Sequence, residues 1–149
     1  MKRLLVILVS LILIPIIVRF GVQIANNCIA MEVEKEIKSL PLPERTNYIE
    51  SISAAEKLVG NGNGMQYFGA MLIKSELSLE ELDTYYSVYR ENDWVYLVRR
   101  QTDSVIMDEN WTVGDLSFKS DIYSDDYYVV YSWGDTDIVF VSWFDISGH

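Results

Sequence analysis

The chain has 149 residues, enough for one domain plus a membrane anchor, and half of its residues are apolar, which argues against a disordered protein. Its charge is unevenly divided: residues 1–30 carry three basic side chains and no acidic one, whereas residues 31–149 carry all 22 acidic residues and nine of the twelve basic ones, a net of −13. Such an acidic domain repels phosphates, so we expect no nucleic acid partner. The single cysteine, Cys28, excludes an internal disulfide, and the domain must be stable through its core alone.

The N-terminal segment predicts a transmembrane helix. Residues 4–18 are apolar except for one serine and one proline, and this run of 15 residues spans only about 22 Å. The hydrocarbon layer of a membrane is about 30 Å thick. If Arg19 snorkels toward the headgroups, the helix over residues 4–25 reaches about 33 Å, which is sufficient. We therefore predict a cytoplasmic tip at residues 1–3 and a single-pass anchor at residues 4–25.

Two alternatives to an uncleaved anchor stay open. Lys2 and Arg3 before the apolar run suit a cleaved signal peptide, whose best cut falls after Ala30, 12 residues beyond the run. A lipoprotein would carry its lipid on Cys28, although Asn27 stands where a lipid-attachment motif has a small residue. By the positive-inside rule, the basic start of the chain lies in the cytoplasm and the acidic domain lies outside it.

Helical spacing of apolar residues continues beyond the anchor. It extends from residue 30 to residue 40 and predicts a juxtamembrane helix over residues 26–40. Pro41 and Pro43 end this helix, because proline cannot continue the helical hydrogen bonding. Residues 41–46 then form a linker, and residues 47–149 form one extracytoplasmic domain.

The first half of the domain predicts a hairpin followed by a helix. Residues 47–59 and 65–73 have strand character, and the alternating Gly-Asn sequence at 60–64 is typical of a hairpin turn. Ser78 and Glu81 have the spacing of a capping box, which marks the start of a helix. Four apolar residues share one face of this helix: Leu79, Leu82, Tyr86 and Tyr89.

The second half of the domain predicts four further strands, at residues 94–98, 118–123, 127–133 and 138–144. Residues 101–116 are mostly polar and predict a loop, with at most a short strand near Val105. The expected fold is α+β: one antiparallel sheet of about five or six strands in the order ββαββββ, with one helix packed across a face.

The predicted anchor is followed by Leu40-Pro41-Leu42-Pro43, a hairpin, the run SLEELDTYY at residues 78–86, and Trp94. This order resembles that of small, uncharacterised, membrane-anchored bacterial envelope proteins, and the resemblance covers most of residues 40–98. It implies a bacterial origin and an envelope location. It carries over no functional residue.

No motif in the sequence points to catalysis. The lone histidine, His149, is the last residue, and the glycine-rich turn at 60–64 lacks the Gly-Lys-Ser/Thr of a phosphate-binding loop. Aspartates gather at 121–126 and 135–137 without the spacing of a calcium loop, so solvated turns explain them better than a weak cation site does. We therefore expect no enzyme, no cofactor and no metal.

Aromatic residues are dense near the C-terminal end, and this density suggests a binding function. Strand alternation sends Tyr127, Tyr131 and Trp133 to one face of the sheet and Tyr128 to the other. Exposed aromatic patches often bind partners, although ordinary core packing is the alternative role for these rings. The candidate partner-binding residues are Tyr123, Tyr127, Tyr128, Tyr131, Trp133 and Trp143.

Two functions are compatible with these features. The first is a non-catalytic, membrane-anchored binding or assembly module that meets a protein or envelope glycan outside the cytoplasm. The alternative is an acidic immunity or inhibitor-type protein that neutralises a basic toxin or enzyme through electrostatic steering.

Overall fold

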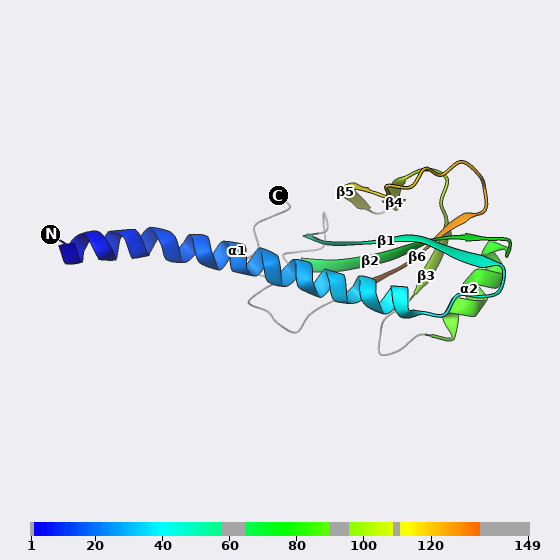
Figure 1. Ribbon diagram of the computed structural model, residues 1–149, viewed down its shortest axis with the longest axis horizontal. Helices are drawn as coiled ribbons and strands as arrows, with labels where there is room; N and C mark the ends of the chain where they lie inside the picture. The colour runs from blue at the N-terminus through cyan, green and yellow to red at the C-terminus, as the bar shows by residue number, and fades with distance from the viewer. Residues whose placement is uncertain (1, 58–64, 90–95, 109–110, 135–149) are drawn as a thin grey trace.

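The structure, a computed structural model, describes residues 2–57, 65–89, 96–108 and 111–134. The protein has an α+β fold, in which a long N-terminal helix extends well beyond the domain and packs against it with its second half (Figure 1). The elements in chain order are α1 (Lys2–Ser39), β1 (Thr46–Lys57), β2 (Met65–Ser75), α2 (Leu79–Ser87), β3 (Leu97–Arg100), β4 (Val105–Asp108), β5 (Trp111–Ser117) and β6 (Tyr127–Gly134).

The two halves of α1 have different surroundings, although the helix runs through Pro15 without a break. No side chain from Leu11 to Phe20 is buried, and the apolar ones are exposed on every side of the helix. By length and composition, α1 could cross a membrane. Farther along, one face of the helix is buried at Val22, Asn26, Ala30, Val33 and Ile37, which recur every three or four residues.

The main sheet has the strand order β1-β2-β6-β3, and all its neighbouring strands are antiparallel. β1 and β2 pair from Thr46↔Ser75 to Lys57↔Met65, as expected for the two strands of a hairpin. The predicted turn at 60–64 lies outside the described residues. β2 is buried along nearly its whole length because it is a central strand with cover on both faces.

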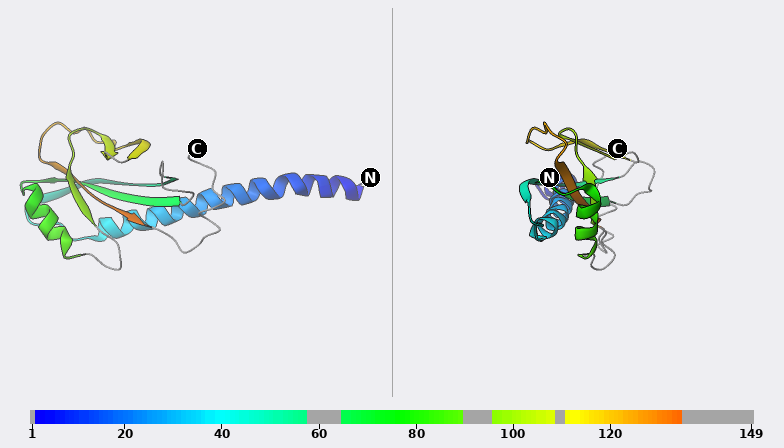
Figure 2. Two further views of the ribbon diagram at one scale, coloured as in Figure 1. Left: turned by 180° about the vertical axis from the view of Figure 1, so that it is seen from behind. Right: turned by 90° about the vertical axis from the view of Figure 1, so that its right-hand side faces the viewer.

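Two apolar clusters lie on opposite faces of the main sheet. On one face, α1 and α2 pack against β2 and β6, with Ile37, Leu82 and Val130 fully buried. On the other face, the β4–β5 hairpin and the segment 118–126 cover Phe68 and Leu72. Figures 1 and 2 show the two helices on one side of the sheet and β4 and β5 on the other.

Close packing and three hydrogen bonds fasten α1 to the sheet. A Cβ atom at Gly69 would lie 2.7 Å from the backbone nitrogen of Glu34, so only glycine allows the helix to approach β2 this closely. Ser51 and Ser53 on β1 donate hydrogen bonds to the Glu34 carboxylate at 2.6 and 2.7 Å. Deeper in the core, the hydroxyl of Tyr67 donates to the side-chain oxygen of Asn26 at 2.7 Å.

The helical cover differs from the single helix that the sequence predicts. α2 packs on the sheet as expected, but α1 covers a larger part of the same face, against β1, β2 and β6. Val33 and Ile37 are fully buried in this contact, so the second half of α1 belongs to the core of the fold.

The strand pattern after α2 also differs from the prediction. The short strand expected near Val105 is present as β4, but the rest of residues 101–116, expected as a loop, contains most of β5, and Ile106 belongs to the same apolar cluster as Phe68 and Leu72. Burial of these few apolar side chains outweighs the polar composition of the segment. The described residues therefore form a sheet of four strands and a separate sheet of two, and not one sheet of five or six.

Residues 118–123, expected as a strand, are irregular. The backbone N–H groups of Lys119 and Ser120 donate to the Glu50 carboxylate at 2.8 and 2.9 Å, so two donors that a strand would use for pairing are bound to a side chain. β3 begins at Leu97, later than predicted, and both Trp94 and the expected strand at 138–144 lie outside the described residues.

Candidate functional site

The candidate aromatic residues occupy different environments. Tyr123 has 75% of its surface exposed, whereas Tyr127 and Tyr128 are buried, at 4% and 3%. Tyr131 and Trp133 are half-buried and pack against Phe68, with ring centroids 6.0 and 4.8 Å apart. Trp143, the sixth candidate, lies outside the described residues.

The alternation predicted for β6 is present in the structure. Tyr127, Tyr131 and Trp133 belong to the cluster beneath the β4–β5 hairpin, and Tyr128 belongs to the cluster beneath the helices. Because both faces are covered, alternation directs most of these rings into the two cores. Tyr123 is thus the most exposed of the five described candidates, and we take its surroundings as the candidate site.

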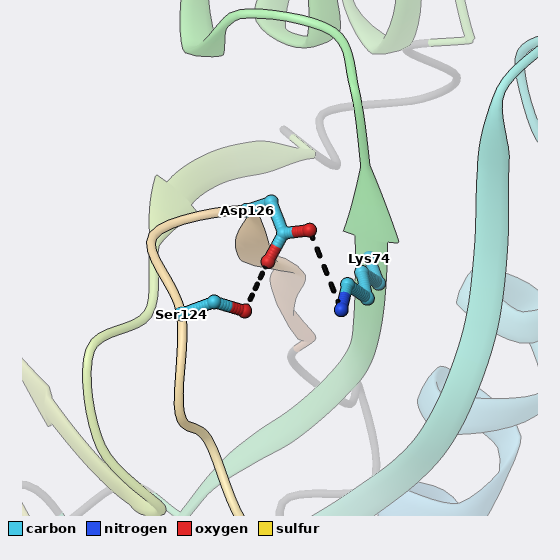
Figure 3. Close-up of polar contacts among 3 residues, drawn as sticks. All are labelled: Lys74, Ser124 and Asp126. Carbon is cyan, nitrogen blue, oxygen red and sulfur yellow. Dashed lines mark hydrogen bonds and ion pairs between the residues drawn. The ribbon is translucent and has the colours of Figure 1, made fainter.

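Tyr123 belongs to a small cluster in which two tyrosine rings meet a lysine. We call the residues Lys74, Tyr123, Ser124, Asp126 and Tyr127 the Lys74 cluster. The Lys74 Nζ atom lies 5.1 Å from the ring centroids of both Tyr123 and Tyr127, and 3.4 Å from Asp126 Oδ2. Ser124 donates a short hydrogen bond to the other carboxylate oxygen of Asp126 (Figure 3).

The main sheet positions this cluster. β2 and β6 pair in a register that places Lys74 opposite Tyr127, and the backbone N–H of Ser75 donates to the carbonyl of Asp126 at 2.9 Å. The cluster lies where β2 ends and β6 begins, at the end of the domain remote from the N-terminus of α1 (Figures 1 and 2).

The two neighbouring tyrosine side chains shift each other's pKa in opposite directions. Interaction with the Tyr127 side chain lowers the pKa of Tyr123, and the nearby Lys74 charge lowers it further. The same interaction raises the pKa of Tyr127 to about 12. The hydroxyl of Ser124 lowers the pKa of Asp126, with a smaller contribution from Lys74, so Asp126 is ionised at neutral pH.

The cluster holds the Tyr123 ring in place and leaves one side of it open to a partner. Lys74 is already engaged by Asp126 and by both rings, so it offers little to an anion. Asp121 and Asp125, close in sequence to the exposed ring, are themselves exposed. An exposed aromatic face in an acidic segment suits a cationic group of a partner. Within the described ranges, no three His, Cys, Asp or Glu residues gather closely enough to hold a metal ion.

Lys74 and Asp126 were not predicted from the sequence as members of this aromatic site. The available signal was a lysine that follows the apolar run of β2 and an aspartate directly before β6. Neither signal shows that the two meet, because β2 and β6 are not consecutive strands and their pairing depends on the whole sheet.

Comparisons of this chain with family models, with curated proteins and with solved structures give no match.

Proposed function

We propose that this protein is a non-catalytic binding or assembly module held at a cell membrane by α1, with its N-terminus in the cytoplasm and its domain outside. The supporting observation is the division of α1: residues 11–20 expose apolar side chains on every side, and the second half of the helix is part of the domain core. A helix that is apolar all round is stable within lipid and not in water. The basic residues at its start favour the stated orientation.

Membrane fractionation and labelling test this anchoring. The protein should stay with membranes in alkaline carbonate and leave them only in detergent. Cys28 is the single cysteine and is exposed, so a membrane-impermeant maleimide should label it on intact cells. Intact-mass analysis should find the whole chain. A product that begins at Met31, or one that carries lipid on Cys28, would contradict an uncleaved anchor.

The proposed partner surface is the Tyr123 end of the domain, and the proposed partner is a protein or an envelope glycan. Support comes from the exposed ring, which Lys74 and Tyr127 hold in a defined position. Capture by the full-length membrane form should be lost in Tyr123→Ser and retained in Tyr48→Ser. Tyr48 is a suitable control because it is a partly exposed tyrosine on β1, outside the Lys74 cluster. Equal capture by both variants would exclude this surface.

An acidic inhibitor of a basic toxin or enzyme is the second candidate. The favouring observations are the net charge of −13 on residues 31–149 and the exposed residues Asp121 and Asp125, each two residues from Tyr123 in the sequence. Binding driven by charge weakens steeply as salt rises, whereas glycan capture on a ring does not. An oligo-arginine peptide is a direct probe. Salt-sensitive binding that Asp121→Asn and Asp125→Asn weaken would favour the inhibitor, and absence of binding would favour the module.

A further inference from the structure

The domain begins on α1 almost immediately after the exposed apolar segment. Arg19 and Phe20 are exposed, and a Cβ atom at Gly21 would have no neighbour within 4 Å. One residue later, Val22 is only 4% exposed, and Asn26 is 1% exposed and bonded to Tyr67. No free stretch of helix separates the apolar segment from the packed one.

The length of the apolar segment matches one bilayer without surplus. Residues 4–21 form 18 helical residues and span about 27 Å, close to the hydrocarbon thickness of about 30 Å. If this segment spans the membrane, none of it is left to form a stem. We propose that the domain sits directly on the bilayer, with phospholipid headgroups as the partner of its membrane-proximal end. This inference depends on the membrane anchoring proposed above.

Arg19 is the residue best placed to contact those headgroups. It precedes Val22 and Asn26 by three and seven residues, so it lies on the same face of α1, one turn below the point where the domain covers that face. It is the only basic residue between Arg3 and Lys35. A guanidinium in this position binds lipid phosphate in a bidentate manner, and it offsets the repulsion between phosphate and the acidic domain.

The opposite face of α1 supplies positions for measuring the depth of the helix. Phe20, Ile24, Cys28 and Met31 are all exposed and lie on the side of α1 opposite its buried residues, so cysteines there leave the described core unchanged. The full-length protein would be reconstituted in phosphatidylcholine vesicles and treated with a membrane-impermeant maleimide. The four probes are native Cys28 and Phe20→Cys, Ile24→Cys and Met31→Cys in a Cys28→Ser background. Each labelling rate is divided by the rate measured for the same variant after solubilisation and unfolding.

If the domain sits on the headgroups, the labelling rate should change sharply between two neighbouring positions on α1. Cysteines at positions 20 and 24 should react several-fold more slowly than those at 28 and 31. A seven-residue helical insert after Gly21 lifts the domain by about 10 Å and nearly preserves its direction around the helix. The insert should release position 24 to rapid labelling, which shows that its protection comes from the bilayer.

Charge variants test the contact of Arg19 with phosphate. Arg19→Glu should speed labelling at position 24 several-fold, because a carboxylate at phosphate level drives the helix outward. Arg19→Lys should not do so, and Arg3→Glu at the other end of the helix is the matched control. Far-UV circular dichroism checks that each variant keeps its fold.

Different outcomes contradict different parts of the proposal. Labelling at position 24 as fast as at 31 would show a domain that stands clear of the bilayer, and protection of Cys28 would show one that is immersed in it. An unchanged rate in Arg19→Glu would exclude the phosphate contact. If the protein fails to float with the vesicles at all, the membrane anchoring itself is wrong.

Discussion

Gly69 is the residue on which the docking of α1 most directly depends. A methyl group there would lie 2.7 Å from the backbone nitrogen of Glu34 and 2.9 Å from the carbonyl carbon of Val33. Because these are backbone atoms, the whole helix must shift to relieve the clash. We expect Gly69→Ala to lower the free energy of unfolding by about 1–3 kcal/mol, the usual cost of overpacking. Chemical denaturation of the full-length protein in detergent measures it.

Gly21→Ala is the matched control for this substitution. Nothing lies within 4 Å of its Cβ position, and alanine favours a helix over glycine. The denaturation midpoint should therefore stay the same or rise. A similar loss of stability in both variants would show that the cost does not arise from the contact between Gly69 and α1.

Glu50 makes the stability of the fold depend on pH in the acidic range. Burial tends to raise the pKa of Glu50, but hydrogen bonds from the Ser120 hydroxyl and from the N–H groups of Lys119 and Ser120 lower it overall. A carboxyl whose pKa is lowered in the folded state makes its full contribution to stability at pH values above its ordinary pKa of 4.5. This contribution is lost as the pH falls through the lower pKa of the folded state.

The corresponding test follows the free energy of unfolding from neutral pH into acid. Glu50→Gln should lower stability at neutral pH and should make the decline below the ordinary pKa shallower than in the unchanged protein. Glu44→Gln, an exposed position before β1, is the control and should keep the full decline. Parallel curves for the unchanged protein and Glu50→Gln would contradict the role of this carboxylate.

Residue exposure was the part of the candidate site that the sequence could least predict. The period of two in β6 correctly separates Tyr128 from Tyr127 and Tyr131. Which of these rings reach solvent depends on what covers each face, and the β4–β5 hairpin that covers one of them comes from a segment too polar to predict more than a short strand near Val105. Tyr123 is exposed because its segment is irregular, where the sequence predicted a strand.

α2 shows how well local signals specify an element. The predicted capping box is present: the Ser78 hydroxyl accepts a hydrogen bond from the backbone N–H of Glu81, and the Glu81 carboxylate accepts one from the N–H of Ser78 at 2.8 Å. These contacts join residues three apart in the chain, so the sequence contains all the information they need. Strand pairing such as β2 with β6 has no comparable local signal.

Substitutions in α2 separate capping from packing. Leu82 is fully buried, so Leu82→Ala should cost about 2–5 kcal/mol of unfolding free energy. Ser78→Ala should cost about 1 kcal/mol through the lost cap. Leu79 is 38% exposed, although the sequence placed it on the same face, so Leu79→Ala should cost clearly less than Leu82→Ala. Denaturation midpoints of the three variants give this order, and a harmless Leu82→Ala would contradict the packing of α2.

At the scale of the whole molecule, the core extends across the predicted boundary between the juxtamembrane helix and the domain. Ala30, Val33 and Ile37 of α1 pack in one cluster with β2, β6 and α2. A fragment that begins at Gly21 keeps this cluster, whereas one that begins at Pro41 lacks the residues that α1 contributes to it. We expect the first fragment to unfold cooperatively on heating and the second to show no cooperative transition. Circular dichroism of both fragments tests this, and a cooperative transition in the shorter one would show that the sheet and α2 are sufficient.

The continuity of α1 determines the direction in which the domain faces around the helix axis. Each residue of a helix turns the chain by about 100°, and no loop between Arg19 and Val22 absorbs such a turn. The direction in which the domain faces is therefore fixed relative to the sides of the exposed apolar segment of α1. If that segment spans a membrane as proposed, a neighbouring membrane protein that contacts one side of it always meets the same side of the domain. Two extra residues after Gly21 would swing the domain by about 200° and present the opposite side to that neighbour, with the fold unchanged.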